Sequence, residues 1–223
     1  MIFTDDCTKP VLDVWKGADA QTLDRIQTVS RGGPNKGPFR RLTLKDGDNA
    51  PTWTSPSSRS GGYGERVELG RNSLSYAPFL YRDGDEAITT LNYRLLSGYP
   101  IAAQRFQTLM QMKQTGPSSL SPCLAIRAFR GRWELINTHN DGTQTIHWTT
   151  PAVLGRWEKF QLIVGYGAEG EIDFSFRDVR IPTIRTNTLI GGQPSHLRCG
   201  YYRDSSLSGG VVIDVGPTSV DGI

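Results

Sequence analysis

Alternation of apolar and polar residues, repeated along most of the chain, limits most strongly how this protein can fold. Such alternation puts apolar side chains on one face of an extended strand and polar side chains on the other. The segments with this pattern are residues 65–69, 88–96, 105–114, 123–129, 132–136, 160–166, 172–176, 197–203 and 211–215. Because turn residues bound each segment, the sequence predicts an all-β jelly roll, a concanavalin A-like β-sandwich of two antiparallel sheets with a concave groove.

Signals for helix are weak by comparison. Residues 19–29, DAQTLDRIQTV, favour a helix of two to three turns with Asp19 as its N-cap. Pro100 suits the start of a short helical turn before the strand at 105–114. We expect little other helix.

The chain reads as one domain over residues 1–223, with a less regular N-terminal part at about 1–60. The 25 glycines and 13 prolines mark frequent turns. Residues 55–64, SPSSRSGGYG, are expected to form a flexible loop. We find no internal repeat and no linker long enough to separate two domains.

The charge balance excludes several classes of partner. A net charge of +3 permits an acidic partner, but the runs of like charge typical of nucleic-acid tails are absent. No stretch is apolar enough for a membrane helix. The first ten residues, MIFTDDCTKP, lack a signal peptide, so we expect a cytoplasmic protein, or a secreted or periplasmic one if a leader has been removed. The oligomeric state and the disulfide state of Cys7, Cys123 and Cys199 stay open.

Three predicted strands concentrate charged or amide side chains on one face, which an ordinary solvent-exposed strand face does not require. They are Arg66 and Glu68 on the first, Gln111 and Lys113 on the second, and His196, Arg198 and Tyr202 on the third. If the three strands lie side by side, these residues form one polar wall on a curved sheet. Gly200, on the same face, would leave room for a ligand to approach the backbone.

The opposite faces of the second and third strands are apolar. They carry Phe106, Met110 and Met112 on the second strand, and Leu197, Cys199 and Tyr201 on the third. Adjacent residues of a strand point to opposite faces. We therefore expect Tyr201 in the core and Tyr202 on the polar wall.

These three strands resemble the sheet motifs of jelly-roll polysaccharide lyases. Residues 64–70 (GERVELG), 109–114 (LMQMKQ) and 197–204 (LRCGYYRD) match the R-x-E-L-R, Q-I-H and Y-F-K-A-G-x-Y strands of alginate lyases in order and approximate spacing. The resemblance spans roughly residues 60–220 and is greatest to heparin lyase I and the glucuronan lyases. It implies an enzyme that cleaves a uronate-containing, acidic polysaccharide by β-elimination.

The resemblance also implies roles for the polar residues. Tyr202 matches the catalytic Tyr of the family and would protonate the leaving oxygen, or act as both acid and base. Arg66 and Gln111 would neutralise the uronate carboxylate. From their positions on the strands, we place Glu68, Arg198, Arg94 and Arg127 in the substrate-binding set, with Glu68 orienting Arg66 by an ion pair. Arg66 and Glu68 also fit a simple cross-strand ion-pair ladder, and outward arginines on strands are also common as solvated surface.

One departure concerns the proton acceptor. The family usually carries His where this chain has Lys113. A lysine acts as a base only if its pKa falls from about 10.4, so we interpret Lys113 as an electrostatic group. His196 shares the face of Tyr202 and could replace the missing imidazole, whereas His139 and His147 fit loop or hairpin positions.

The sequence supports two other functions less well. Glu171 and Asp173 begin the E-x-D-x-x-E pattern of retaining glycosidases, but Phe176 stands at its last position. A lectin without catalysis remains an alternative, with Trp53, Trp133, Trp148 or Trp157 to stack on sugars, although Trp133 and Trp157 fit core positions better. No cofactor motif occurs; Asp204 and Asp214 are the only carboxylates we weigh as structural calcium ligands. Which uronate polymer is cleaved stays open.

Overall fold

Two antiparallel β-sheets make up most of the protein. The computed structural model describes residues 2–61, 64–70, 80–115 and 121–222. Within these residues each sheet has ten strands, and every strand pairing is antiparallel. The predicted fold class is therefore confirmed.

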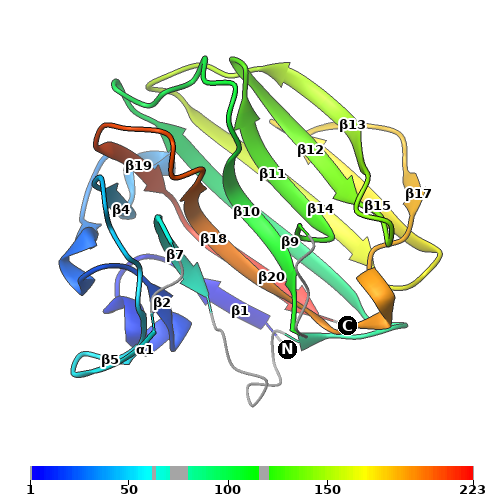
Figure 1. Ribbon diagram of the computed structural model, residues 1–223, viewed down its shortest axis with the longest axis horizontal. Helices are drawn as coiled ribbons and strands as arrows, with labels where there is room; N and C mark the ends of the chain where they lie inside the picture. Colours follow the sequence, from blue (N-terminus) through cyan, green and yellow to red (C-terminus); the bar gives the residue numbers. More distant parts are fainter. Residues whose placement is uncertain (1, 62–63, 71–79, 116–120, 223) are drawn as a thin grey trace.

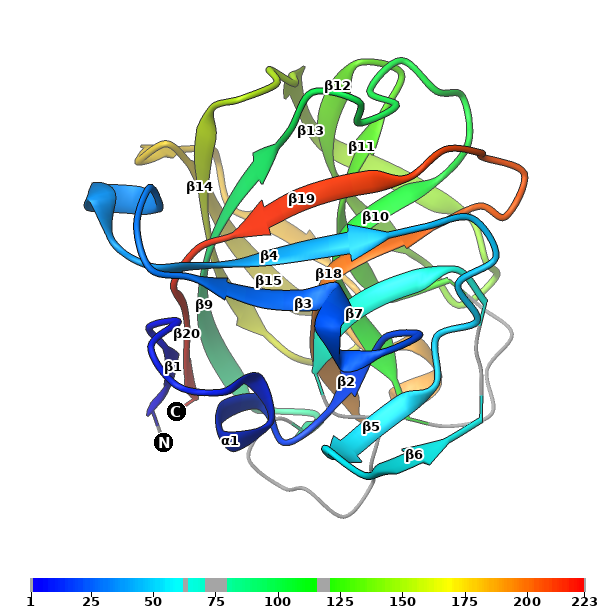
Figure 2. The ribbon, with the colours of Figure 1, turned by 90° about the vertical axis from the view of Figure 1, so that its left-hand side faces the viewer.

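The first sheet joins segments from both halves of the chain. Its order is β16 (Val179–Arg180), β15 (Gly170–Phe176), β14 (Trp157–Gly165), β9 (Glu86–Leu95), β19 (Val211–Val215), β4 (Phe39–Leu44) and β3 (Ile26–Val29). Its other strands are β17 (Ile184–Thr186) on β15, β20 (Thr218–Gly222) on β9, and β1 (Ile2–Asp5) on β20. Because β1 pairs with β20, the two ends of the chain lie close together (Figure 2).

The second sheet carries the polar strands. Its order is β13 (Gln144–Pro151), β12 (Arg132–Thr138), β11 (Leu124–Phe129), β10 (Gln107–Gln114), β18 (Ser195–Arg203), β7 (Arg66–Gly70), β2 (Ala18–Asp19), β5 (Thr52–Ser55) and β6 (Ser58–Ser60), with β8 (Leu80–Tyr81) paired to β18. Figure 1 shows β10 to β13 running side by side next to β18. Three predicted strands far apart in sequence, β7, β18 and β10, are thus neighbours.

Helix is confined to short segments in the described part of the chain. They are α1 (Val11–Trp15) and the 3-10 turns Leu23–Arg25, Pro34–Lys36 and Ile190–Gly192. None of the described helices has the length and apolar character needed to cross a membrane. At Pro100 the chain makes a single turn, closed by a bond from the Ala103 N–H to the Pro100 carbonyl.

The helix predicted over residues 19–29 does not form. Asp19 belongs to β2, residues 23–25 form one 3-10 turn, and residues 26–29 form β3. Pairing of β2 with β7 and of β3 with β4 outweighs the weak local helix preference. The loop expected at 55–64 contains the hairpin strand β6, and its residues 62 and 63 lie outside the described residues.

The core lies between the two sheets and is built largely from the predicted alternation. Along β9 every second residue is buried, including Leu91, Tyr93 and Leu95. The Trp133 ring of the second sheet contacts the Phe160 ring of the first, with centroids 5.0 Å apart. These contacts hold the sheets together by burying apolar surface.

A β-bulge in β10 reverses the phase of the alternation. The register with both neighbours shifts between Thr108 and Met110, so Leu109 and Met110 are consecutive and both fully buried. Residues before the bulge therefore point to the face opposite the one that strict alternation predicts. Phe106, predicted in the core, instead lies 37% exposed on the outer side.

Candidate active site

The predicted polar wall exists on the outer face of the second sheet. Gln111 of β10 lies opposite Arg198 of β18, and Tyr202 of β18 lies opposite Arg66 of β7. The predicted side-by-side arrangement of the three strands is therefore correct. A pocket of about 410 Å³ opens on this face, and Arg66, Gln111, Lys113, Tyr202 and Arg127 all line it.

Glu68 is the centre of a hydrogen-bond network at the base of this wall. Its buried carboxylate accepts a bond from Gln111 Nε2 at 2.5 Å and one from Arg66 Nη1 at 3.3 Å. Arg198 Nη1 lies 3.6 Å away on the other side. The arrangement fixes the positions of Gln111 and Arg66, which agrees with the orienting role expected for Glu68.

Asp19 completes this network and was not recognised as a site residue from the sequence. Arg198 Nη1 donates to its carboxylate at 2.5 Å, and the Thr52 hydroxyl donates to the other oxygen. Both Asp19 and Arg198 are buried. Arg198 therefore pairs with carboxylates of the protein itself. No local signal in the sequence would have identified Asp19, because its position depends on the long-range pairing of β2 with β7.

His196 does not replace the imidazole of the lyase family. It is buried, and its Nε2 accepts a hydrogen bond from Arg198 Nε at 3.2 Å. Burial, together with the positive charges of Arg198 and Lys113, lowers the pKa of His196 to about 3. The ring is therefore neutral with its Nε2 lone pair engaged, so the structure contradicts a role as general base.

Tyr202 stands at the open side of the wall. Its ring is half-buried, lies under the Arg66 guanidinium with 4.0 Å from Cζ to the ring centroid, and contacts the Phe106 ring at 5.0 Å. Tyr201 points the opposite way: it is fully buried, and its hydroxyl donates to Gln107 Oε1 at 2.7 Å. The predicted division between the two tyrosines is correct.

Lys113 occupies the pocket beside Gln111. Its side chain is half-buried and lies opposite His196 across the β10–β18 pairing. Burial, and then the positive charges of Arg198 and Arg66, lower its pKa from the ordinary lysine value. Lys113 is thus more easily deprotonated than a surface lysine.

The predicted substrate-binding arginines do not all lie at the pocket. Arg127 on β11 lines the pocket, where it donates to Glu134 at 2.7 Å and to Gln144 at 3.1 Å. Arg94 belongs to β9 of the other sheet and pairs with Asp214 at 2.7 Å, so it does not reach the pocket. That prediction is wrong, because the outward face of β9 belongs to the far side of the sandwich.

Gly200 allows close packing of a neighbouring strand and does not provide space for a ligand. Its φ is +151°, and a Cβ built there would lie 2.3 Å from the Val67 carbonyl oxygen and 2.7 Å from the Glu68 Cα. The absent side chain makes room for the neighbouring strand β7. The expected ligand approach at Gly200 is therefore corrected to a close contact between strands.

The carboxylates considered for calcium have other partners. Asp214 is buried and accepts hydrogen bonds from Arg41 and Arg94, and Asp204 accepts one from the Ser206 N–H. Within the described residues, no group of three or more His, Cys, Asp or Glu side chains gathers in a way that could hold a metal ion.

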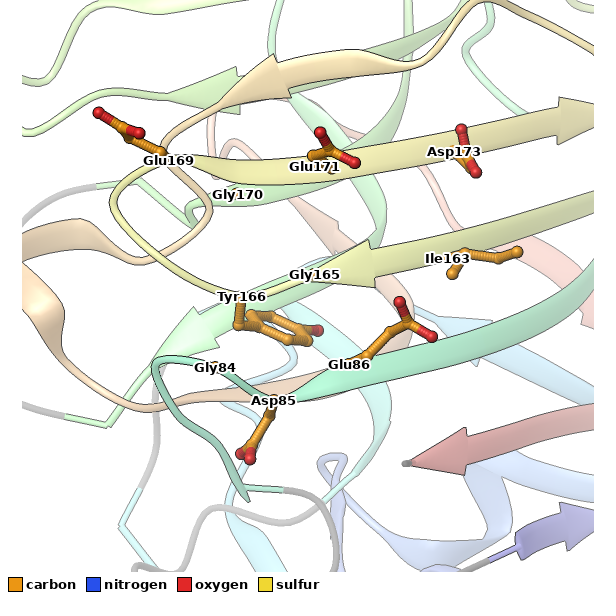
Figure 3. Close-up of a pocket in the computed structure, with 10 residues that line it drawn as sticks. All are labelled: Gly84, Asp85, Glu86, Ile163, Gly165, Tyr166, Glu169, Gly170, Glu171 and Asp173. Atoms are coloured by element: carbon orange, nitrogen blue, oxygen red, sulfur yellow. The ribbon is translucent and has the colours of Figure 1, made fainter.

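A second pocket lies on the first sheet and has the opposite charge. Figure 3 shows its acidic residues, which are Asp85, Glu86, Glu169, Glu171 and Asp173. Glu171 pairs with Arg185 at 2.9 Å and Asp173 with Arg180 at 2.7 Å. The pair considered for glycoside hydrolysis is thus an ion-paired surface, and such a pocket would repel a polyanion.

The tryptophans weighed as sugar platforms lie away from the pocket. Trp133 is fully buried, Trp148 packs against Phe174 at 4.9 Å, and the ring N–H groups of Trp53 and Trp157 donate to the backbone. Among the described lining residues the aromatic ones are Phe106 and Tyr202.

Comparisons with known proteins identify a sequence family and similar folds. A sequence model of the family described as polysaccharide lyase matches residues 10–219. The fold is similar to that of an endo-beta-1,4-glucuronan lyase from the fungus Trichoderma reesei, with a TM-score of 0.62 and 14% identity over 91% of this chain and 93% of that chain. It is also similar to the alginate lyase AlyC3, with a TM-score of 0.55 and 11% identity over 82% and 75% of the two chains.

The fold also occurs outside lyases. The binding domain of botulinum neurotoxin DC, solved in complex with rat synaptotagmin II, gives a TM-score of 0.53 at 8% identity, over 91% of this chain and 42% of that chain. At these identities the structural likenesses show the fold alone. No curated protein sequence matches the chain significantly.

Proposed function

Because this chain belongs to the polysaccharide lyase family, we propose that it cleaves a uronate-containing polysaccharide, of the glucuronan, alginate or glycosaminoglycan type, by β-elimination. The observation that carries the proposal is the pocket on the second sheet, where Arg66, Gln111 and Lys113 lie with Tyr202. Cationic and amide donors suit a carboxylate substrate, and the tyrosine supplies an acid.

Elimination needs charge neutralisation at the uronate carboxylate. Removing the C5 proton spreads negative charge onto that carboxylate, and fixed donors lower the barrier to this step. Arg66 and Gln111 can supply such donors, and Glu68 holds both through hydrogen bonds. Preorganisation of this kind requires no rearrangement during the reaction.

The leaving O4 must receive a proton as its bond to C4 breaks. Tyr202 is the acid that we assign to this step, since it lines the pocket and a phenolic O–H is a proton donor. The Arg66 guanidinium over its ring stabilises the phenolate that results.

The test is to incubate the protein with glucuronan, alginate and glycosaminoglycans and to follow the ultraviolet absorbance of the unsaturated uronate. The expected result is a rise with at least one polymer, since only elimination forms the C4–C5 double bond. Binding to a polymer without such a rise would contradict the proposal and favour a lectin. Release of reducing ends without absorbance would instead indicate hydrolysis.

A further inference from the structure

The pocket on the second sheet is longer than one sugar ring. Its lining residues come from six consecutive strands of the sheet, which are β7, β18, β10, β11, β12 and β13. At about 4.8 Å per strand, the backbones of the outermost two lie about 24 Å apart along the sheet. A polysaccharide that follows this pocket therefore places more than one sugar in it, although only one of them is the uronate that undergoes elimination.

A row of paired residues crosses the sheet within this pocket. Tyr202 lies opposite Arg66 on one side and opposite Thr108 on the other. Thr108 in turn lies opposite Arg127. All four side chains line the pocket. Three strand spacings, about 14 Å along the sheet, thus separate the backbones of the two arginines.

The guanidinium groups of the two arginines do not converge. Arg127 Nε donates to Glu134 on β12 at 2.7 Å, and Nη1 donates to Gln144 on β13 at 3.1 Å, so its partners lie on the side away from Tyr202. The Arg66 guanidinium instead lies over the Tyr202 ring, 4.0 Å from Cζ to the ring centroid. A carboxylate bound at Arg127 therefore belongs to a different sugar from one bound at Arg66.

The surroundings of Arg127 repeat those of Arg66. Each side chain is 13% exposed and pairs with a buried glutamate, Glu134 for Arg127 and Glu68 for Arg66. The arginines line the pocket and the two glutamates do not, and a pocket-lining glutamine completes each group. In the described part of the chain, the bonds of Arg127 use two of its five N–H donors, which leaves others to bind a carboxylate.

From this repeated arrangement we infer that Arg127 binds the carboxylate of a second uronate in the same polymer, an inference that rests on the β-elimination proposed above. Arg66 and Gln111 serve the uronate that reacts, and Arg127 serves one that does not react. Binding at this second sugar helps to position the reacting one. It also selects polymers rich in uronate over polymers in which uronates are isolated among neutral sugars. Arg127 is thus a specificity-determining residue with no part in proton transfer.

The test changes the enzyme and the polymer together. One polymer is the polyuronate that the wild type cleaves, and the other is the same polymer after partial carboxyl reduction, which converts most uronates to neutral hexoses and keeps the backbone. Arg127→Gln removes the cation. Arg127→Gln combined with Glu134→Gln leaves no buried carboxylate without its partner, in case the single change unfolds the protein. Arg185→Gln, at an exposed ion pair with Glu171 on the first sheet, is the matched control.

On the unmodified polymer we expect Arg127→Gln to lower kcat/KM by about tenfold, mainly through KM, because a charge-assisted contact with substrate is lost. On the reduced polymer, with rates expressed per remaining uronate, this variant should match the wild type. The double variant should behave in the same way, and Arg185→Gln should match the wild type on both polymers.

Equal losses on both polymers in a variant with a wild-type melting temperature, or no loss on either polymer, would overturn this inference alone. A wild-type protein that forms no unsaturated uronate from any polymer would overturn the proposed function and this inference together.

Discussion

Tyr201 and Tyr202 are adjacent on β18 but differ in their surroundings. Tyr201 is buried between the sheets, whereas Tyr202 faces the pocket. Because adjacent residues of a strand point to opposite faces, the first packs in the core and the second is available for catalysis. The same contrast holds for His196, whose polar ring faces the wall but is bound by Arg198. At this scale, burial and partners decide what a side chain can do.

Tyr202→Phe removes only the hydroxyl. We expect turnover on the cleaved polyuronate to fall by about 10²- to 10⁴-fold, because a general acid is lost. Polymer affinity and melting temperature should stay near the wild-type values, since the ring contacts with Arg66 and Phe106 remain. Initial rates from ultraviolet absorbance measure the effect, and turnover near the wild-type level would show that Tyr202 is not the acid.

Tyr201→Ala should instead destabilise the fold by about 3–5 kcal/mol, through the cavity left by a fully buried ring and the loss of the bond to Gln107. Urea denaturation measures the change in the free energy of unfolding. A loss below about 1 kcal/mol would contradict the buried placement.

His196 makes stability depend on pH. Its pKa is about 3 in the folded protein and about 6.5 when unfolded, so the unfolded chain binds more protons between these values. Stability from this residue is present above about pH 6.5 and is lost as the pH falls toward 3, by at most about 5 kcal/mol. His196→Gln should flatten this part of the curve in denaturation at pH 7 and pH 4; an unchanged slope would show that another group causes it.

At the scale of elements, the site depends on how closely β7, β18 and β10 approach. Gly200 lets β7 pack against β18, and the bulge at Leu109 and Met110 turns Phe106 toward Tyr202. Neither Gly200 nor the bulge would contact a substrate, yet both determine the positions of the pocket side chains.

Gly200→Ala should cost on the order of 2–4 kcal/mol, because its Cβ would meet the Val67 carbonyl and its φ is positive. Gly98→Ala is the matched control, since its φ is +90° but no atom lies within 4 Å of the added Cβ. Thermal melts of both variants separate the steric clash from backbone strain. Equal losses in the two proteins would mean that the close approach of β7 is unimportant.

At the scale of the whole molecule, the two pockets on opposite sheets differ in charge. The pocket on the second sheet contains Arg66, Lys113 and Arg127, whereas the pocket on the first is lined by carboxylates. The net charge of +3 does not reveal this division. The pocket on the second sheet therefore suits a polyanion better than the pocket on the first.

Affinity for the polyuronate should fall with salt. Raising ionic strength from 0.1 M to 1 M shortens the Debye length from about 10 Å to about 3 Å. With two or three partly buried cations involved, we expect Kd to rise on the order of tenfold. Calorimetry with Tyr202→Phe, which leaves the polymer intact, measures it; a constant Kd across this range would show that binding does not depend on these charges.

The sequence by itself determined the strands, the face of each side chain along most of them, and the set of polar residues that includes Arg66, Gln111 and Tyr202. Local periodicity carries this information, because an extended chain alternates its side chains whatever its neighbours are. The short motifs added the likeness to lyases. The exceptions were the helix expected at 19–29 and the phase of Phe106, where strand pairing and a bulge override the local pattern.

Only the tertiary structure decided which residues share the site. Asp19 reaches Arg198 because β2 pairs with β7, and Arg94 is excluded because β9 lies in the other sheet. Protonation was also decided there: burial and two nearby cations keep His196 neutral, and burial with two guanidinium groups lowers the pKa of Lys113. Such effects depend on distance through space, which the order of residues along the chain does not contain.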